Sequence, residues 1–332
     1  MRDTFSKADL HVHSSFSFDV PDLAALHPRA LFEAALGHPD PERRLDWFAL
    51  TDHDTMAGWE ALVRELPEAD RALVIPAVEH TLLDPSIGFT IHTNLYGLDP
   101  DTYARMRAAV RTLDELCLFC REHGILYQYN HPTWWERAEL RRGQVDFARV
   151  PEIAARFPVL ELNAARTPAQ NLITAGLAAE RGLPLTASSD THTGAVGRGW
   201  TAAPGRTAAE FLGAVWRGEG STHLDHLSHE ALVDEAHGLI DEFMDRGHIH
   251  GPAGREASSP AQAWLEHMAL LLVRSRWVQQ TPAARESLRA LLKHASVPIL
   301  KAVMGHEHRL DRRLADSELR TYLTRAHVAN AA

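Results

Sequence analysis

The sequence predicts an α/β fold in which a small barrel of parallel strands is followed by an all-helical C-terminal extension. Three observations support this. From residue 7 to about residue 220 short apolar runs alternate with helical patterns, glycines close several predicted helices, and no convincing strand pattern occurs beyond about residue 225. Such alternation is typical of βα units and a mostly parallel sheet. Seven strands in about 200 residues fit a small barrel better than an open sheet.

Seven runs carry the strand pattern. In order along the chain they span residues 8–13, 47–51, 73–78, 90–96, 125–129, 159–162 and 185–188. The first run shows the two-residue period of a strand most clearly, because Asp9, His11 and His13 alternate with Leu10 and Val12. This alternation places three polar side chains on one face of the first strand.

Predicted helices fill the segments between these strands and make up the rest of the chain. In the first part they span residues 28–36, 55–66, 100–123, 168–181 and 208–217; later amphipathic patterns lie at 232–244, 260–278, 282–294 and 317–329. Gly37, Gly124 and Gly182 follow three of the helices as C-caps. Residues 251–260, rich in Gly, Pro and Ser, predict a loop or linker. We therefore expect a barrel over residues 1–224 and a helical extension over residues 225–332.

The composition is that of an ordinary globular enzyme, with 332 residues of which 45% are hydrophobic. The sequence has no N-terminal apolar run and no apolar stretch of about 18 residues or more, so it predicts neither a signal peptide nor a membrane span. A cytoplasmic location is the default expectation. Cys117 and Cys120 lie within a predicted helix, not at a strand-to-helix turn, and are interpreted as buried thiols.

The net charge of −10 and the lack of a basic stripe argue against a long nucleic-acid partner, which clustered Lys and Arg usually bind. A small phosphorylated substrate is compatible with an acidic chain, since a metal ion supplies positive charge locally. The helical extension could pack on the barrel, form a lid or mediate self-association, so an oligomer remains an open alternative.

Polar side chains occur at or near the end of nearly every predicted strand. The motifs are His11-Val-His13, Thr51-Asp52-His53-Asp54, Glu79-His80, the segment around His92, Asn130-His131, Glu161-Leu-Asn163 and Ser189-Asp190-Thr191-His192. The carboxyl ends of strands in a parallel barrel converge on a common mouth, where active sites are built. Imidazole and carboxylate groups are common ligands of first-row metals. The pattern therefore predicts a multinuclear metal site at this mouth.

These motifs, in this order, resemble those of the PHP (polymerase and histidinol phosphatase) family of metal-dependent phosphoesterases. The resemblance rests on His11-Val-His13, Leu-Thr-Asp-His-Asp-Thr at residues 50–55, Glu79, the His131-Pro pair and Ser-Asp-Thr-His at residues 189–192. It covers roughly residues 7–220. It implies a distorted (β/α)7 barrel with two or three divalent metal ions, commonly zinc, iron or manganese.

The resemblance also implies which residues bind these ions. The implied ligands are His11, His13, Glu79 and Asp190 for the first ion, Glu79, His92 and His131 for the second, and Asp19, His53 and His192 for the third. Phe18 separates Ser17 from Asp19, whereas many members of the family have Ser-Asp-Gly at this place. His80, beside Glu79, is an alternative to His92.

The reaction expected of such a site is hydrolysis of a phosphate ester, either a monoester or a small phosphodiester. A hydroxide bridging two ions would attack phosphorus while the ions neutralise the charge on the oxygens. Arg166 and Arg198 are candidates for binding the phosphate, because a guanidinium group matches its geometry. Asp54 and His192 are both candidates for the acid that protonates the leaving group. In this assignment Asp190 and His192 serve catalysis as well as metal binding.

Two other functions remain open from the sequence. An amidohydrolase also begins with His-x-His in a barrel, but its usual bridging ligand is a carboxylated lysine near mid-barrel. The lysines here are Lys7, before the first strand, and Lys293 and Lys301, in the helical extension. A non-catalytic PHP module of a larger assembly would be marked by lost ligands, and none of the main positions is lost.

Overall fold

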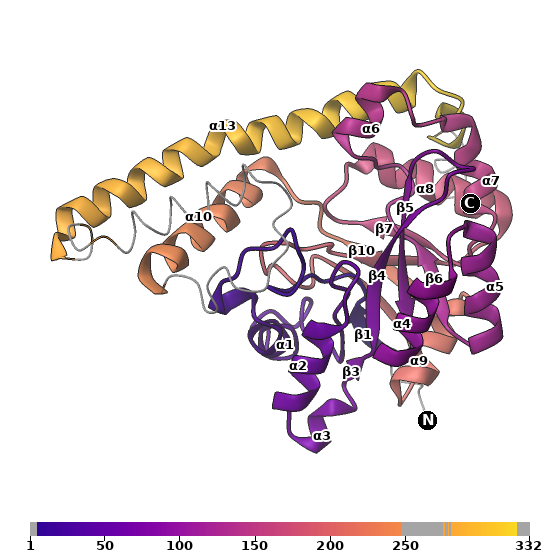
Figure 1. Ribbon diagram of the computed structural model, residues 1–332, viewed down its shortest axis with the longest axis horizontal. Coiled ribbons are helices and arrows are strands. Elements are labelled where there is room, and N and C mark those ends of the chain that lie inside the picture. Colours follow the sequence, from indigo (N-terminus) through magenta and orange to yellow (C-terminus); the bar gives the residue numbers. More distant parts are fainter. Residues whose placement is uncertain (1–4, 247–274, 276–277, 279, 324–332) are drawn as a thin grey trace.

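The computed structural model describes residues 5–246, 275, 278 and 280–323, and these form a mixed α/β structure with two five-stranded sheets. Helices cover the sheets, and a long C-terminal helix, α13 (Pro282–Ala315), runs across one side of the molecule (Figure 1). The α/β class and the helical character of the C-terminal region are therefore confirmed.

The first sheet has the order β10-β9-β1-β2-β3. Its strands are β1 (Phe5–Asp9), β2 (Trp47–Ala49), β3 (Val74–Ile75), β9 (Gly199–Pro204) and β10 (Ser221–Leu224). β1, β2 and β3 are parallel, as expected, whereas β9 pairs antiparallel with β1, and β10 antiparallel with β9. β9 and β10 were not predicted, since neither carries a continuous run of large apolar residues.

The second sheet has the order β4-β5-β6-β7-β8. Its strands are β4 (Ala77–Leu83), β5 (Thr90–Tyr96), β6 (Leu126–Tyr129), β7 (Leu160–Asn163) and β8 (Leu185–Ser188). β6, β7 and β8 are parallel, but β5 runs antiparallel to both β4 and β6. The expectation of a mostly parallel sheet is therefore wrong, and the sheets are mixed.

The two sheets meet at the ends of their parallel strands. Isolated parallel bridges join Val12 to Thr191 and His53 to Glu79. Between them, the Thr51 N–H donates to the carbonyl of Val12 at 2.8 Å. The strand ends thus surround a common mouth, but the two sheets do not form one closed seven-stranded barrel.

Helices cover the outer faces of both sheets. They are α1 (Pro28–Leu36), α2 (Ala57–Glu65), α3 (Glu68–Arg71), α4 (Pro100–Ala109), α5 (Leu113–His123), α6 (Arg137–Arg142), α7 (Val150–Ala154), α8 (Pro168–Arg181) and α9 (Ala208–Trp216), with short 3-10 turns at Ala24–Leu26 and Phe147–Arg149. The single helix predicted over residues 100–123 is in fact two, α4 and α5. Thr112 divides them, because its side chain accepts the N–H of Glu115 while the Glu115 side chain accepts the N–H of Thr112.

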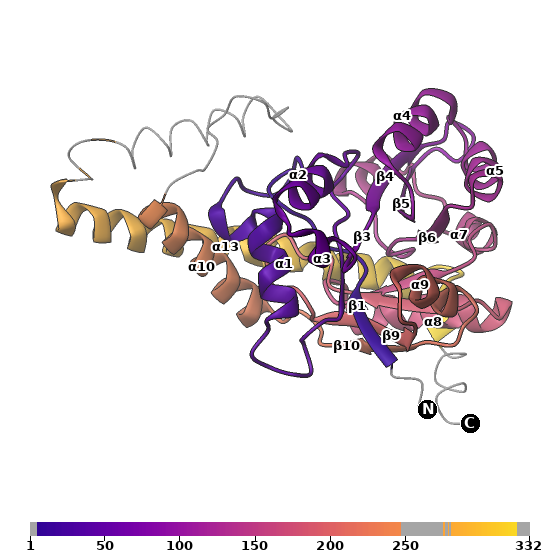
Figure 2. The same ribbon diagram turned by 90° about the horizontal axis from the view of Figure 1, so that it is seen from below.

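In the C-terminal region α10 (His229–Arg246) and α13 lie side by side in both views (Figures 1 and 2). Asp241 of α10 joins them through Lys293 Nζ at 2.6 Å and Arg289 Nη1 at 3.1 Å. The helix predicted over residues 282–294 continues to Ala315, with Pro298 in its interior. A proline there removes one hydrogen bond of the helix, because it has no backbone N–H. The loop predicted at 251–260, most of the helix predicted at 260–278, and residues 324–329 of the helix predicted at 317–329 lie outside the described residues.

The far end of the C-terminal region shares a core with the second sheet. Leu310, Leu314, Leu319 and Tyr322 belong to the same cluster of buried apolar side chains as residues of β4–β7 and α8. This end of the extension therefore packs on the barrel-like body. The predicted boundary between the two parts, at residue 224, stays a prediction.

Cys117 and Cys120 are free and buried in α5, as predicted, and burial raises the pKa of Cys120 to about 12. Within the described ranges, no helix has both the length and the apolar character that crossing a bilayer requires. The expected cytoplasmic location stays a prediction.

The capping box at Thr112 leads to the first prediction. Thr112→Ala removes the side-chain acceptor for the Glu115 N–H at the start of α5, so it should lower the free energy of unfolding by about 1 kcal/mol. Urea unfolding followed by circular dichroism measures the change. Glu122→Ala, at an exposed site of the same helix, is the control and should stay within about 0.5 kcal/mol of wild type. Equal losses in the two variants would contradict the role given to the cap.

Candidate metal centre

The segment that follows β1 carries two fully buried histidines directed at one point. His11 and His13 have no exposed surface, and their Nε2 atoms lie 3.0 Å apart. The other ring nitrogen of His11, Nδ1, lies 2.7 Å from Glu161 Oε1. A carboxylate in this position accepts the Nδ1–H and leaves the Nε2 lone pair directed toward His13 and the centre of the site. This is how a metal-ligating histidine is usually oriented.

The carboxylate of Glu79, in β4, lies at the centre of the site and is fully buried. The nearest ring nitrogens are His11 Nε2 at 3.0 Å, His13 Nε2 at 3.2 Å and His53 Nδ1 at 3.3 Å from Oε2, and His92 Nδ1 at 3.1 Å and His131 Nε2 at 3.6 Å from Oε1. Burial acts to raise the pKa of Glu79, but His53 and His11 outweigh it and hold that pKa well below its usual range. Glu79 is therefore an ionised carboxylate that several imidazoles share.

Asp190, which follows β8, provides a second buried carboxylate. Its Oδ1 lies 3.4 Å from His11 Nε2 and 3.3 Å from His13 Nε2. Its Oδ2 accepts hydrogen bonds from Arg166 Nη2 at 2.8 Å and Asn163 Nδ2 at 3.1 Å. Burial acts to raise the pKa of Asp190, but its cationic neighbours, His11 first, hold it well below the usual range. One oxygen of Asp190 is thus held by the protein and the other faces the histidines.

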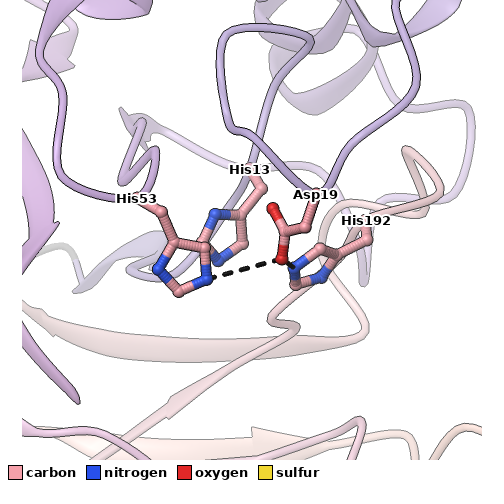
Figure 3. Close-up of side chains that lie close together, drawn as sticks. All are labelled: His13, Asp19, His53 and His192. Atoms are coloured by element: carbon pink, nitrogen blue, oxygen red, sulfur yellow. Dashed lines mark hydrogen bonds and ion pairs between the residues drawn. The ribbon is translucent and has the colours of Figure 1, made fainter. Parts of the chain in front are cut away.

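Asp19 lies within reach of the site despite the intervening Phe18. Its Oδ2 lies 2.8 Å from His192 Nε2 and 3.5 Å from His53 Nε2 (Figure 3). The Phe18 side chain is 46% exposed, and its ring centroid is 5.1 Å from that of His53. Because Phe18 points outward over His53, the extra residue lengthens the loop without carrying Asp19 away.

Three overlapping groups have all their ligand atoms within 4.8 Å of one another: His11, His13 and Glu79; His53, Glu79 and His92; and His13, Asp19, His53 and His192. The first corresponds to the predicted first group, with Asp190 beside it. The second group contains His53 where the sequence predicts His131. His131 lies beside this group, with its Nε2 at 3.6 Å from Glu79 Oε1. His13 joins the predicted third group. His53 therefore lies between the second and third groups and not in the third alone.

The strand directions decide between His92 and His80. His92 is the third residue of β5, and because β5 runs antiparallel to its neighbours, its N-terminal end reaches the mouth. Neighbouring residues of a strand face opposite ways, so His80 points away from the carboxylate of Glu79. His80 Nδ1 instead lies 3.3 Å from both Tyr103 Oη and Asp54 Oδ1. The structure brings His92, and not His80, to the site.

The two candidate arginines lie in different surroundings. Arg166 is nearly buried and contacts Asp190, so it belongs to the site. Arg198 instead pairs with Glu235 of α10, Nε to Oε1 at 3.0 Å, and with Asp225, Nη1 to Oδ2 at 3.3 Å. These contacts join α10 to the start of β9, and they do not support a phosphate-binding role for Arg198.

Asp54 is a poor candidate for the leaving-group acid. Its Oδ1 accepts the Thr81 N–H at 3.0 Å and lies close to His80. Burial acts to raise its pKa, but the hydrogen bonds from His80 and Thr81 outweigh it and lower the pKa. The carboxylate of Asp54 therefore carries no proton to donate near neutral pH.

Left-handed backbone conformations occur at three non-glycine residues of the described chain, all in segments that form the mouth. They are Asp54 with φ of 54°, His131 with φ of 30° and Asp190 with φ of 51°. Such conformations cost energy and persist where the surrounding structure enforces them, which is common at functional sites. In this chain they direct residues that follow β2, β6 and β8.

Glu161 and Asn130 belong to the polar motifs noted at the strand ends, but the sequence did not assign them the supporting role that the structure shows. Glu161 holds His11, accepts the His131 N–H at 2.8 Å and is bonded by the Ser188 hydroxyl. Asn130 Nδ2 donates to Glu79 Oε1 at 2.8 Å. The alternation of Glu161 and Asn163 with Leu160 and Leu162 is the available signal, since two polar groups on one face of a buried strand need partners.

The donors of these groups fit divalent transition metals. His53 Nδ1 is buried and forms no hydrogen bond with the described residues, although it lies 3.3 Å from Glu79 Oε2. A buried ring nitrogen of this kind has its lone pair available for an ion. Mixed imidazole and carboxylate sets are bound by zinc, iron and manganese. The residues present therefore fit the metals that the resemblance implies.

Comparison with known families supports this picture in one segment. Residues 168–219 match the family model PHP_C, described as PHP-associated. This segment includes Asp190 and His192 and confirms the resemblance to the PHP family there. None of the curated proteins matches the sequence.

Solved structures show only partial likeness. A two-domain protein from Bacteroides vulgatus, containing a predicted PHP-like metal-dependent phosphoesterase, is 16% identical, with 70% of this chain and 69% of that chain covered and a TM-score of 0.48. An amidohydrolase from Chromobacterium violaceum is 17% identical, with 56% of this chain and 87% of that chain covered and a TM-score of 0.39. A lesion-specific endonuclease from Pyrococcus furiosus is 15% identical, with 86% of this chain and 89% of that chain covered and a TM-score of 0.46. The expectation that no long nucleic acid is bound stays a prediction.

The second prediction concerns metal content. Glu79→Gln and Asp190→Asn keep the shape of the side chain and remove its charge, so each should lower the metal bound per chain while the far-UV circular dichroism stays unchanged. Glu122→Gln, on the exposed surface of α5, is the control and should bind as much metal as wild type. Elemental analysis by mass spectrometry measures the content. A wild-type metal content in either site variant would show that the assignment of these carboxylates is wrong.

Proposed function

We propose that this protein is a PHP-type phosphoesterase that hydrolyses a phosphate monoester or a small phosphodiester at a centre of two or three divalent ions. One observation supports this above all. The buried, ionised carboxylate of Glu79 is shared by imidazoles from separate segments of both sheets. Burying this many charged groups in an apolar core would destabilise the fold, whereas a multinuclear metal site requires such groups as ligands.

The geometry supports a specific division of ligands. His11, His13, Glu79 and Asp190 would hold the first ion; Glu79, His92 and His131, with His53 nearby, the second; and Asp19, His53, His192 and His13 surround the third position. The strand ends that surround this mouth also favour describing the fold as a distorted barrel. Zinc, iron and manganese all accept this donor set.

Bound divalent ions would supply an activated water and would neutralise negative charge on the phosphate oxygens. The protein's own part is orientation. Glu161 holds the ring of His11, and Asn130 holds one oxygen of Glu79. His192 Nδ1 donates to the carbonyl of Asp190 at 3.0 Å, which orients the ring so that Nε2 faces Asp19 Oδ2 at 2.8 Å, where a metal ion would be shared by the two atoms. Since the His192 side chain is 33% exposed, it marks the open side of the mouth from which a substrate would enter.

The contacts of the lysines weigh against the amidohydrolase alternative. Lys7 Nζ donates to the carbonyls of Pro41 and Glu42 at the protein surface, and Lys293 pairs with Asp241. Lys301 is exposed on α13. Glu79 takes the central position at which an amidohydrolase usually has a carboxylated lysine. The retained ligand set likewise favours an enzyme over a non-catalytic module.

The third prediction tests the function. Purified protein supplied with Mn²⁺ should release p-nitrophenol from p-nitrophenyl phosphate or bis(p-nitrophenyl) phosphate, and the preferred compound distinguishes monoester from diester chemistry. Because the chain is acidic, single-stranded and duplex DNA should be poor substrates in the same assay. Protein that binds no transition metal and hydrolyses neither ester would contradict the proposal.

A matched pair of variants ties the activity to the site. His92→Ala should lower kcat/KM by more than about 100-fold, because even residues that only support a metal ligand contribute about 10- to 100-fold. His80→Ala, which lies beside Glu79 in sequence but points away from the site, should retain activity within a few-fold of wild type. Loss of activity in the His80 variant and retention in the His92 variant would reverse the assignment.

A further inference from the structure

We propose that Glu307, which the C-terminal helix α13 supplies, is a positioning residue of the metal centre that holds Arg166 against Asp190. The inference rests on the proposed function, since it takes Asp190 as a metal ligand. It gives the helical extension a part in the site that its sequence does not indicate.

Glu307 is a buried acidic residue with three donors from three different segments. It is 5% exposed. Its Oε1 accepts Trp134 Nε1–H at 3.0 Å and lies 3.3 Å from Arg166 Nη1, and its Oε2 accepts from Gln170 Nε2 at 2.9 Å. Burying a carboxylate is costly unless a charge and hydrogen bonds compensate for it. This compensation fixes α13 over the loops that follow β6 and β7.

Arg166 connects Glu307 to the metal centre. One terminal nitrogen, Nη1, contacts Glu307, and the other, Nη2, donates to Asp190 Oδ2 at 2.8 Å. Its guanidinium carbon lies 4.5 Å from the ring centroid of Trp134, so the group also stacks on that indole. Because a guanidinium group is planar and rigid, holding one nitrogen and one face determines where the other nitrogen points. Glu307 and Trp134 together therefore set the direction from which Arg166 reaches Asp190.

The effect on Asp190 follows from which oxygen is held. Arg166 and Asn163 occupy Oδ2, and Oδ1 remains directed toward His11 and His13. Without Arg166, Oδ2 would keep Asn163 as its one donor, and the orientation of the carboxylate would be less firmly held. Arg166 is already engaged by two carboxylates, which favours this positioning role over direct binding of the substrate phosphate.

A control residue lies one turn further along α13. Asp311 Oδ1 accepts from the Thr167 hydroxyl at 2.7 Å and from Gln170 Nε2 at 3.2 Å, so it also fixes α13 to α8. None of its hydrogen bonds or ion pairs among the described residues involves Arg166 or Asp190. Asp311 shares the donor Gln170 with Glu307 but contacts neither Arg166 nor Asp190, so Asp311→Asn tests the docking of the helix while both contacts of Arg166 stay in place.

The experiment uses the full chain, stripped of metal and titrated with Mn²⁺ alone in a calorimeter. Glu307→Ala should weaken Mn²⁺ binding by about 10- to 100-fold, the range typical of residues that orient metal ligands, and Glu307→Gln should weaken it less. Asp311→Asn should stay within about threefold of wild type. In an Arg166→Met background, Glu307→Ala should have little further effect, because Glu307 acts through Arg166. Circular dichroism of the metal-free proteins checks that each variant is folded.

Three results would overturn the inference: folded Glu307 variants that bind Mn²⁺ as wild type does, an Asp311→Asn loss as large as that of Glu307→Ala, or equal Glu307→Ala losses with and without Arg166. Activity then separates the two proposals. If Mn²⁺ binding responds as expected but no phosphate ester is hydrolysed, the proposed function fails and the role of Glu307 stands. If the wild type binds no metal, both fail.

Discussion

The organisation of this protein depends on a carboxylate buried among imidazoles. Glu79 has no contact with solvent, yet it stays ionised because His11, His13 and His53 approach one of its oxygens within 3.3 Å. Glu79 in turn raises the pKa values of His11 and His53, against the effect of burial. Buried imidazoles balance the charge of the buried carboxylates in the absence of ions, and divalent cations would take over this balance when bound.

The two sheets serve this site by bringing strand ends together. The segments that follow β1 and β2 carry His11, His13 and His53, while β4 and β5 carry Glu79 and His92. The reversal of β5 matters because it lets a residue near the start of a strand reach the same mouth. Left-handed residues after β2, β6 and β8 then turn the chain sharply at the mouth. These conformations are unfavourable, and the packing of the apolar clusters on both sheets offsets their cost.

Buried charges are also paired outside the mouth, where the C-terminal helix α13 contributes one of the partners. Glu79 and Asp190 are compensated inside the mouth, Arg166 joins Asp190 to Glu307, and Glu307 lies on α13. Leu310 and Leu314, further along α13, pack into the core of the second sheet. An apolar contact thus holds this part of the helix in place, and a charged network gives it one defined orientation over the rim. Buried ionic groups often add specificity of this kind more than they add stability.

The sequence by itself determined the elements and the chemistry. Apolar periodicity located the central strands and most of the helices, and histidines and carboxylates at the strand ends indicated where ligands gather. These signals are local, because burial and metal binding select residue types position by position. The sequence did not reveal the antiparallel direction of β5, the choice of His92 over His80, the shared position of His53, or the approach of Glu307 to Arg166. Each of these depends on which segments distant in the chain become neighbours, and only the packing of the whole structure decides that.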